Sequence, residues 1–249
     1  MGSSIIQRYS RHIILPDIGG VGQRRLSASR VLVIGAGGLG SPILLYLTAS
    51  GVGQIGVIDF DEVSLSNLQR QIIFMSSDVG KGKVETVEDK LRKLNPNTEV
   101  KGYAFALSEN NVDHIIVNYD LVIDGSDNTK TRYLVNSSCF NLKKPLMSGG
   151  INQWDGYLSL HHSNEGLACY ECLFPEAKNF TTHENCSHAG VFGPLAGVIG
   201  TLMASESIKY LTKAGKVLLN EMILYDALTG TMRRIKMHRR NDCKICAAE

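Results

Sequence analysis

Short segments rich in Val, Ile and Leu recur along the first 150 residues, and longer amphipathic segments separate them. The segments that predict buried parallel strands are VLVI (31–34), IGVID (55–59), DLVID (120–124) and PLMSGG (145–150). Helices are predicted over 39–50, 83–96 and 128–142, and residues 1–29 are expected to form an N-terminal helical segment. Strands that alternate with helices in this way favour an α/β fold.

The helix predicted over 83–96 has a clear apolar periodicity. Its repeat places four apolar residues on one face, namely Val84, Val87, Leu91 and Leu94. Asn95 and Pro96 follow as a helix stop signal. We therefore expect one face of this helix to be buried.

The pattern changes after residue 150. GYLSLHH (156–162) and MRRIKMH (232–238) alternate apolar and polar residues, which predicts antiparallel strands. Residues 192–215 predict one long helix, whereas PEAKNFTTHENC (175–186) has little apolar content and predicts a mobile loop. The sheet is therefore expected to be mixed, with a C-terminal elaboration.

Composition and charge exclude several classes of protein. The 249 residues are 43% hydrophobic and 20% charged with a net charge of +2, as in an ordinary globular protein without a nucleic-acid partner. No apolar run reaches the ~20 residues that span a membrane, and the N-terminus lacks the features of a signal peptide. We expect a cytoplasmic location.

Four of the six cysteines form two C-x-x-C pairs, Cys169 with Cys172 and Cys243 with Cys246. In a reducing compartment this spacing favours a metal over disulfides. Four thiolates complete a tetrahedral shell, so we predict one structural zinc, with four reduced core thiols as the alternative. Because that shell needs no imidazole, the histidines, including His161 and His162, are expected at the surface.

The sequence GAGGLG matches the G-x-G-x-x-G pattern of nucleotide-binding loops, and its glycines are Gly35, Gly37, Gly38 and Gly40. Glycines allow the backbone to approach a phosphate at a helix N-terminus. Asp59 follows at about the ~20-residue spacing of an acid that binds ribose hydroxyls. The pattern predicts a nucleotide without saying which one, and a glycine turn without a ligand is the alternative.

Three charged residues favour ATP over NAD or FAD. Arg70 can bind phosphate oxygens in a bidentate manner, Lys83 can add a second positive charge, and Asp127 can hold Mg²⁺. A triphosphate that loses pyrophosphate needs such cations, whereas a hydride carrier does not. Taken singly, the three residues also fit a surface ion pair, a lysine at a helix N-terminus and a helix cap.

Seven motifs in this order resemble the ThiF/MoeB/HesA family, the bacterial relatives of ubiquitin-activating enzymes. They are RYSRHIILP, GAGGLGSP, DFDEVSLSNLQRQ, GKGKVE, DGSDN, the two C-x-x-C pairs and AGVFGPLAGVIGTLMASESIKYL. The resemblance implies a Rossmann-like ATP-binding fold with a mixed sheet and a C-terminal antiparallel elaboration that carries the zinc site. Residues 1–249 are then a single adenylation domain, with a nucleotide-binding part over 30–150 and a carrier-binding and zinc part over 151–249.

The resemblance also implies a reaction and its partners. The family uses ATP to adenylate the C-terminal glycine of a ubiquitin-like sulfur carrier, either ThiS-like in thiamine synthesis or MoaD-like in molybdopterin synthesis. No rhodanese-like domain follows residue 249, so a separate sulfur donor such as a cysteine desulfurase is expected. Members pair as homodimers, and Arg11 resembles the arginine that reaches into the partner's site.

Carried over by position, the family's nucleotide-binding residues correspond to Gly38, Asp59, Ser66, Asn67, Arg70 and Gln71. Lys83 is similar to the catalytic lysine, with Lys81 as an alternative register. Asp127 and Asn128 resemble the magnesium-holding pair. Cys186 aligns with a cysteine that some members use for a persulfide or acyl link and others function without, and a spare exposed cysteine is the alternative.

Two other classes remain as alternatives. An NAD-linked oxidoreductase would share the glycine loop but would leave Arg70, Lys83 and Asp127 without a role. A non-catalytic nucleotide-binding scaffold would be expected to lack at least one of these three residues. Stabilisation by Mg-ATP compared with NADH separates these alternatives.

Overall fold

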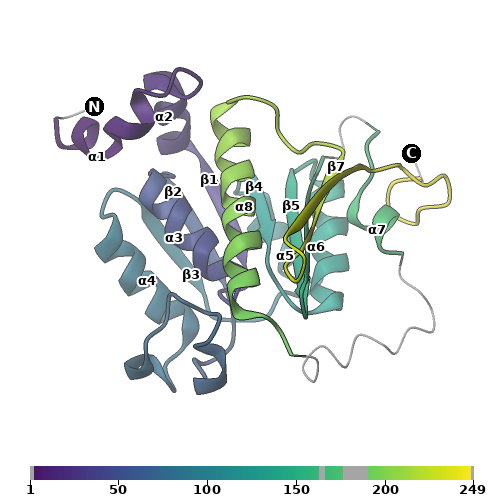
Figure 1. The fold of residues 1–249 in the computed structure, drawn as a ribbon, viewed down its shortest axis with the longest axis horizontal. Helices are drawn as coiled ribbons and strands as arrows, with labels where there is room; N and C mark the ends of the chain where they lie inside the picture. The colour runs from purple at the N-terminus through teal and green to yellow at the C-terminus, as the bar shows by residue number, and fades with distance from the viewer. Residues whose placement is uncertain (1–2, 163–165, 176–189, 248–249) are drawn as a thin grey trace.

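The computed structural model describes residues 3–162, 166–175 and 190–247. Within them one eight-stranded sheet has the order β3-β2-β1-β4-β5-β6-β7-β8 (Figure 1). The strands are β1 (Arg30–Ile34), β2 (Gln54–Ile58), β3 (Glu99–Tyr103), β4 (Leu121–Asp124), β5 (Leu146–Asn152), β6 (Asp155–His161), β7 (Glu221–Asp226) and β8 (Thr231–Lys236).

Strand direction divides the sheet at β5. The strands from β3 to β5 are parallel, whereas β5, β6, β7 and β8 pair antiparallel. In the parallel half, β1 lies between β2 and β4, so the strand order reverses there. Ligands of open α/β sheets bind at the carboxyl ends of the strands beside such a reversal. The predicted mixed α/β fold with antiparallel C-terminal strands is confirmed.

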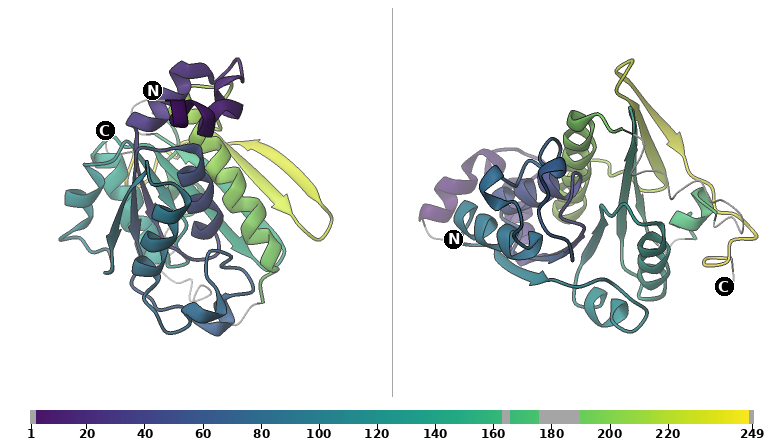
Figure 2. Two further views of the ribbon diagram at one scale, coloured as in Figure 1. Left: turned by 90° about the vertical axis from the view of Figure 1, so that its left-hand side faces the viewer. Right: turned by 90° about the horizontal axis from the view of Figure 1, so that it is seen from below.

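Helices cover both faces of the sheet (Figure 2). One face carries α3 (Gly40–Ser50), α4 (Lys83–Leu94) and α8 (Gly193–Thr212), and the other carries α5 (Val112–Ile116) and α6 (Thr129–Asn141). The remaining helices are α1 (Ser3–Ile13) and α2 (Gly19–Ala28), which pack together with α2 on α8, and the short α7 (Tyr170–Leu173).

Covered faces explain why the inner parallel strands β1, β2 and β4 are mostly apolar. Val31 and Val33 enter the core under α3 and α8, whereas Leu32 and Ile34 enter the core under α5 and α6. Side chains alternate between the faces of a strand, so a strand buried on both sides needs an apolar residue at every position.

The apolar face of α4 is one residue shorter than the sequence predicts. Val84, Val87 and Leu91 are buried, but Leu94 is 38% exposed because it is the last residue of the helix. Asn95 then leaves the helix, and its side-chain amide donates to the Tyr9 hydroxyl at 2.8 Å and to the Thr48 carbonyl at 2.7 Å. The end of α4 is thereby fixed to α1 and α3.

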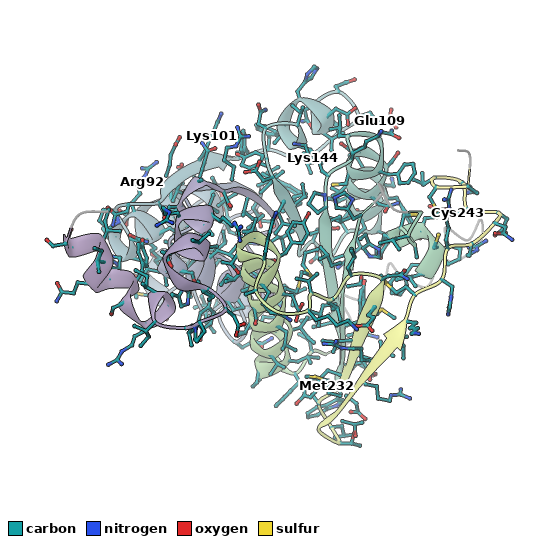
Figure 3. All side chains as sticks on the ribbon, turned by 90° about the horizontal axis from the view of Figure 1, so that it is seen from above. Arg92, Lys101, Glu109, Lys144, Met232 and Cys243 are labelled. Carbon is teal, nitrogen blue, oxygen red and sulfur yellow. The ribbon has the colours of Figure 1, made fainter. Side chains whose placement is uncertain are left out.

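The edge strands differ most from expectation. All residues of β8 are exposed, so its apolar and polar alternation does not mark a buried face. Figure 3 shows Met232 at the outer end of the β7–β8 hairpin, which projects from the body of the fold. Among the described residues, no helix has both the length and the apolar character needed to cross a membrane.

Candidate functional site

A cavity of about 1250 Å³ opens at the carboxyl ends of the parallel strands and extends along the antiparallel half of the sheet. Sites for a single small ligand measure about 300–1,000 Å³, so this cavity can take a nucleotide and part of a second reactant. The glycine loop and most of the predicted charged residues line one end. Tyr157, Phe174 and Tyr225 line the other end.

The glycine loop follows β1 and can close only with glycine at two positions. Gly35 has φ +89°, and a Cβ on Gly40 would lie 2.0 Å from the Gly35 carbonyl oxygen. Gly35, Gly37 and Gly38 line the cavity, whereas Gly40 does not and instead packs against Gly35 as α3 begins. Of the four predicted glycines, three therefore face the ligand space.

Asp59 follows β2 and joins the glycine loop to the next segment. Its carboxylate accepts the Ala36 N–H at 2.8 Å and the Asp61 N–H at 2.9 Å, and its side chain is only 9% exposed. An ionised carboxylate has about four acceptor positions, so two remain for a ligand. Asp59 lines the cavity, where a ribose can reach it.

Lys83 is the first residue of α4 and lies in the cavity wall. Its Nζ atom is 2.8 Å from Asp61 Oδ2 and 3.9 Å from Asp59 Oδ1, and its side chain is 5% exposed. Lys81 instead has a 59% exposed side chain that pairs with Asp78 at 3.3 Å. The positions of the two lysines therefore favour Lys83 over Lys81 as the lysine of the site. Asp61 also lines the cavity, although the sequence does not single it out.

The segment over 65–71 brings further predicted residues to the cavity. Ser66, Arg70 and Gln71 line it, and Arg70 Nη1 donates to the Ser66 carbonyl at 3.3 Å. Gln71 Oε1 is buried without a partner among the described residues, which leaves it available to a ligand donor. Asn67 is not in the wall, and its carbonyl accepts the N–H groups of Arg70 and Gln71.

Asp127 and Asn128 follow β4 but have different surroundings. Asn128 caps α6, because its side-chain oxygen accepts the N–H of Lys130 at 2.9 Å and of Thr131 at 3.3 Å. Asp127 is exposed to the cavity, and its carboxylate has no hydrogen bond or ion pair within the described part of the chain. The Asp127 carboxylate thus fits a hard cation such as Mg²⁺, whereas the Asn128 oxygen is engaged in the cap.

Arg132 is a cavity residue that the sequence does not point to. It lies on α6 and is 9% exposed. Its guanidinium donates to the carbonyls of Ser126 and Gly149, the latter at 2.8 Å, and to the Tyr157 hydroxyl at 3.2 Å. Only its spacing of four residues after Asn128, which puts both on one side of the helix, could have drawn attention to it.

The four paired cysteines form one buried cluster. Their sulfur atoms all lie within 4.8 Å of one another, with 3.6 Å between Cys169 and Cys243 and 3.3 Å between Cys172 and Cys246. A tetrahedral zinc with ~2.3 Å bonds to sulfur separates its ligands by about 3.8 Å, so the cluster fits a zinc site. Figure 3 shows Cys243 on the C-terminal segment, which the cluster connects to α7.

Burial raises the pKa of the Cys246 thiol to about 11, and it also raises the pKa of Cys169. Without a metal these thiols are protonated at neutral pH. Zinc binding must displace those protons, so metal affinity should rise with pH.

His161 is buried, and its predicted surface position is wrong. Its Nδ1 atom is 2.9 Å from the Ala168 carbonyl and its Nε2 atom is 2.8 Å from the Ser159 hydroxyl. Burial lowers the pKa of His161 to about 4, so the ring is neutral and uses one nitrogen as donor and the other as acceptor. β6 is an inner strand of the sheet, which explains why a polar residue at its end is enclosed.

Like Gly40 and Asn67, the predicted residue Arg11 does not line the cavity. Arg11 is exposed on α1 and is absent from the cavity wall of its own chain. Cys186 lies outside the described residues, as does most of the predicted loop over 175–186.

Comparison with known proteins agrees with this arrangement. The model of the ThiF family matches residues 9–245. The chain is 44% identical to a Thermus thermophilus sulfur carrier protein adenylyltransferase, over 98% of this chain and 92% of that protein. It is also 44% identical to the Zea mays adenylyltransferase and sulfurtransferase MOCS3-1, over 98% of this chain but only 52% of that longer protein.

Solved structures of E. coli MccB share the fold. MccB with ATP has a TM-score of 0.80 at 26% identity, covering 91% of this chain and 69% of MccB. MccB with MccA-N7isoASN has a TM-score of 0.84 at 25% identity, covering 97% of this chain and 74% of MccB. By the extent of the family match and its identity to these relatives, the chain belongs to the ThiF family.

Proposed function

We propose that this protein uses ATP to adenylate the C-terminal carboxylate of a ubiquitin-like sulfur carrier protein. One observation carries the proposal: a single cavity gathers the glycine loop, Asp59, Arg70, Lys83 and Asp127, and then continues beyond them. The names of relatives such as the Thermus thermophilus sulfur carrier protein adenylyltransferase support the same reaction.

The nucleotide is assigned to the parallel end of the cavity. The Asp59 carboxylate accepts from the ribose hydroxyls, and the backbone at Gly37 and Gly38 approaches the phosphates. Arg70 and Lys83 supply positive charge to the triphosphate. ATP in the related MccB structure supports this choice over a dinucleotide.

Asp127 is assigned to magnesium. Its unpartnered carboxylate at the carboxyl end of β4 is the kind of oxygen donor that Mg²⁺ takes beside nucleotide phosphates. When bound, Mg²⁺ neutralises phosphate charge as pyrophosphate departs. Asn128 contributes by capping α6, which fixes the backbone next to Asp127.

In the reaction, a carboxylate oxygen of the carrier's terminal glycine attacks the α-phosphorus of ATP. A bond forms between that oxygen and phosphorus, the bond from the α-phosphorus to the bridging oxygen breaks, and pyrophosphate leaves with the electron pair. No general base is needed, because the carboxylate is ionised at neutral pH. Two anions must approach each other, so the cations Arg70 and Lys83 lower the barrier.

The acceptor is assigned to the antiparallel end of the cavity. Its wall there combines aromatic rings with polar groups, as a site for an extended peptide tail requires, and is formed by residues such as Tyr157, Tyr170, Phe174, Tyr225, Asp226 and Arg233. Both a ThiS-like and a MoaD-like carrier fit this chemistry. A separate cysteine desulfurase would supply the sulfur, with Cys186 as a candidate for the later transfer step.

The exposed position of Arg11 suits a role in a second copy of the chain. We propose a homodimer in which Arg11 of one chain reaches the triphosphate of its partner. A surface arginine without such a role is the alternative.

Carrier-dependent exchange of labelled pyrophosphate into ATP tests the proposed reaction. We expect exchange with one carrier that has an intact Gly-Gly end and none with the same carrier lacking its last glycine. If neither carrier type supports exchange, the adenylation proposal fails. Thermal stabilisation by NADH but not by Mg-ATP would instead favour the oxidoreductase.

A further inference from the structure

Ser126, which precedes Asp127, is held at each of its polar groups. Its N–H and its hydroxyl donate to Asp124 Oδ1, at 2.9 Å and 2.6 Å, and its carbonyl accepts from Arg132 Nη2. Asp127 itself has no side-chain partner within the described ranges. The backbone at Ser126 is therefore the fixed point from which the Asp127 side chain extends.

Arg132 links that backbone to two other strands. Its Nη1 atom donates to the Gly149 carbonyl on β5 and to the Tyr157 hydroxyl on β6, and its Nη2 atom donates to the Ser126 carbonyl. The rigid fork of a guanidinium can meet acceptors in fixed directions, which a flexible ammonium cannot. Arg132 thus fixes the loop after β4 relative to the antiparallel strands.

Contacts on several sides hold the Arg132 guanidinium in the cavity wall. The side chain is 9% exposed, and it donates to the neutral oxygens of Ser126, Gly149 and Tyr157. The Tyr170 hydroxyl and the buried Asp124 carboxylate also interact with the guanidinium. Because Asp124 accepts both donors of Ser126, Arg132 and Asp124 hold Ser126 from two sides at the edge of the cavity.

We infer that Arg132 is a positioning residue for magnesium, acting through the Ser126 carbonyl on the Asp127 carboxylate. The inference rests on the proposed function, which assigns Asp127 to the metal. Groups that orient a metal ligand typically change metal affinity ~10–100-fold when they are removed. Loss of Arg132 should therefore weaken the contribution of Mg²⁺ to ATP binding and leave metal-free ATP binding unchanged.

Calorimetric titration of the full chain with ATP, in Mg²⁺ and separately in EDTA, tests the inference without turnover. The dissociation constant for ATP in EDTA, divided by the constant in Mg²⁺, measures how much the metal contributes to binding. We expect Arg132→Gln to reduce this ratio ~10-fold or more, with the EDTA value within twofold of the wild type. Arg132→Lys should reduce the ratio by a smaller factor, because an ammonium can still donate to one of the carbonyls.

Two further variants decide between the outcomes. Lys130→Gln removes one positive charge from an exposed position of the same helix and should leave the ratio unchanged. Asp127→Asn should abolish most of the metal contribution. If Asp127→Asn has no effect, the magnesium assignment in the proposed function fails, and this inference fails with it.

If Asp127→Asn lowers the ratio but Arg132→Gln does not, the proposed function stands and the inference alone is overturned. The inference is also overturned if Arg132→Gln weakens ATP binding equally in EDTA and in Mg²⁺. Arg132 would then contact the nucleotide or support the fold generally. Should Arg132→Gln not fold, Arg132→Lys decides by the same measurement, and an unchanged ratio in that variant counts against the inference.

Discussion

Lys83 and Asp61 form an ion pair inside the cavity, with 2.8 Å between Nζ and Oδ2. The lysine is 5% exposed and the aspartate 54% exposed. In the proposed function, the phosphates of ATP interact with the same ammonium, so we expect the pair to weaken when the nucleotide binds. Asp61 would then compete with the phosphates for the charge of Lys83.

Replacing Asp61 with asparagine should tighten metal-free ATP binding. A partly exposed ion pair contributes ~0.2–1 kcal/mol, so the gain should be at most about fivefold. Calorimetric titration with ATP in EDTA measures it. Glu62→Gln, an equal charge change on an exposed neighbour outside the cavity wall, is the control and should have no effect. Weaker binding in Asp61→Asn would show that Asp61 assists the nucleotide.

Lys83→Ala and Lys81→Ala should differ sharply. Loss of a cation that acts on the transition state costs ~10²-fold or more in rate, so exchange of pyrophosphate should fall by that factor in Lys83→Ala. Lys81 is 59% exposed and pairs with Asp78 outside the cavity wall, so its loss should change the rate less than twofold. Equal losses in both variants would remove Lys83 from its assigned role.

Asp78 accepts the Met75 N–H and pairs with Lys90, and these contacts should make stability depend on pH. The hydrogen bond from Lys90 lowers the pKa of Asp78 to about 2 from its ordinary value of 3.8. The charged form is therefore favoured in the folded state, and this stabilisation is present above pH 4 and lost as the pH falls through about 2.

Asp78→Asn should consequently reduce the free energy of unfolding at pH 7, and the difference from the wild type should shrink between pH 4 and pH 2. Urea denaturation at a series of pH values measures this difference. Asp89→Asn is the control, because Asp89 pairs with Lys93 in an exposed position on α4, the helix that also carries Lys90. A difference that stays constant down to pH 2 would contradict the proposed ion pair.

Zinc should be present at about one ion per chain, and its binding should require the four clustered cysteines but not the other cysteines. Cys243→Ser removes one thiolate and should lower the zinc content strongly, whereas Cys139→Ala, at a buried cysteine outside the cluster, should retain it. Elemental analysis of protein prepared without chelator provides the measurement. Absence of zinc from the wild type would leave four reduced core thiols.

Mixed dimers test the assignment of Arg11. Arg11→Ala and Lys83→Ala are each expected to be inactive alone, but a hybrid of the two contains one site with both residues intact. Partial recovery of pyrophosphate exchange on mixing is therefore expected. No recovery, with hybrid formation verified by mass spectrometry, would place both residues in sites of the same chain or exclude Arg11 from the site.

The sequence predicts best what depends on local pattern. The parallel strands β1, β2 and β4 are mostly apolar because helices cover both faces of the sheet. The helix after the glycine loop is predicted by the glycine motif that precedes it. β3 and β7 are not predicted, because short strands at or near an open edge carry polar and partly exposed residues.

The site shows the same division. Gly35, Asp59, Arg70 and Asp127 lie at the cavity as their motifs predict, since each follows or faces the end of a strand. Arg132 is not predicted, because its role arises only where α6 meets β5 and β6 in space. Asn67 and Gly40 belong to the motifs yet shape turns and do not line the cavity.

The reversal of strand direction at β5 has a consequence for how such proteins diversify. Val122 on β4 pairs with Leu146 in the parallel half, while Met147 pairs with Leu160 in the antiparallel half. Substitutions in β6, β7 and β8 can thus remodel the far wall of the cavity while the glycine loop stays unaltered. The part of the cavity that the parallel strands form and the part that the antiparallel strands form can therefore change independently of each other.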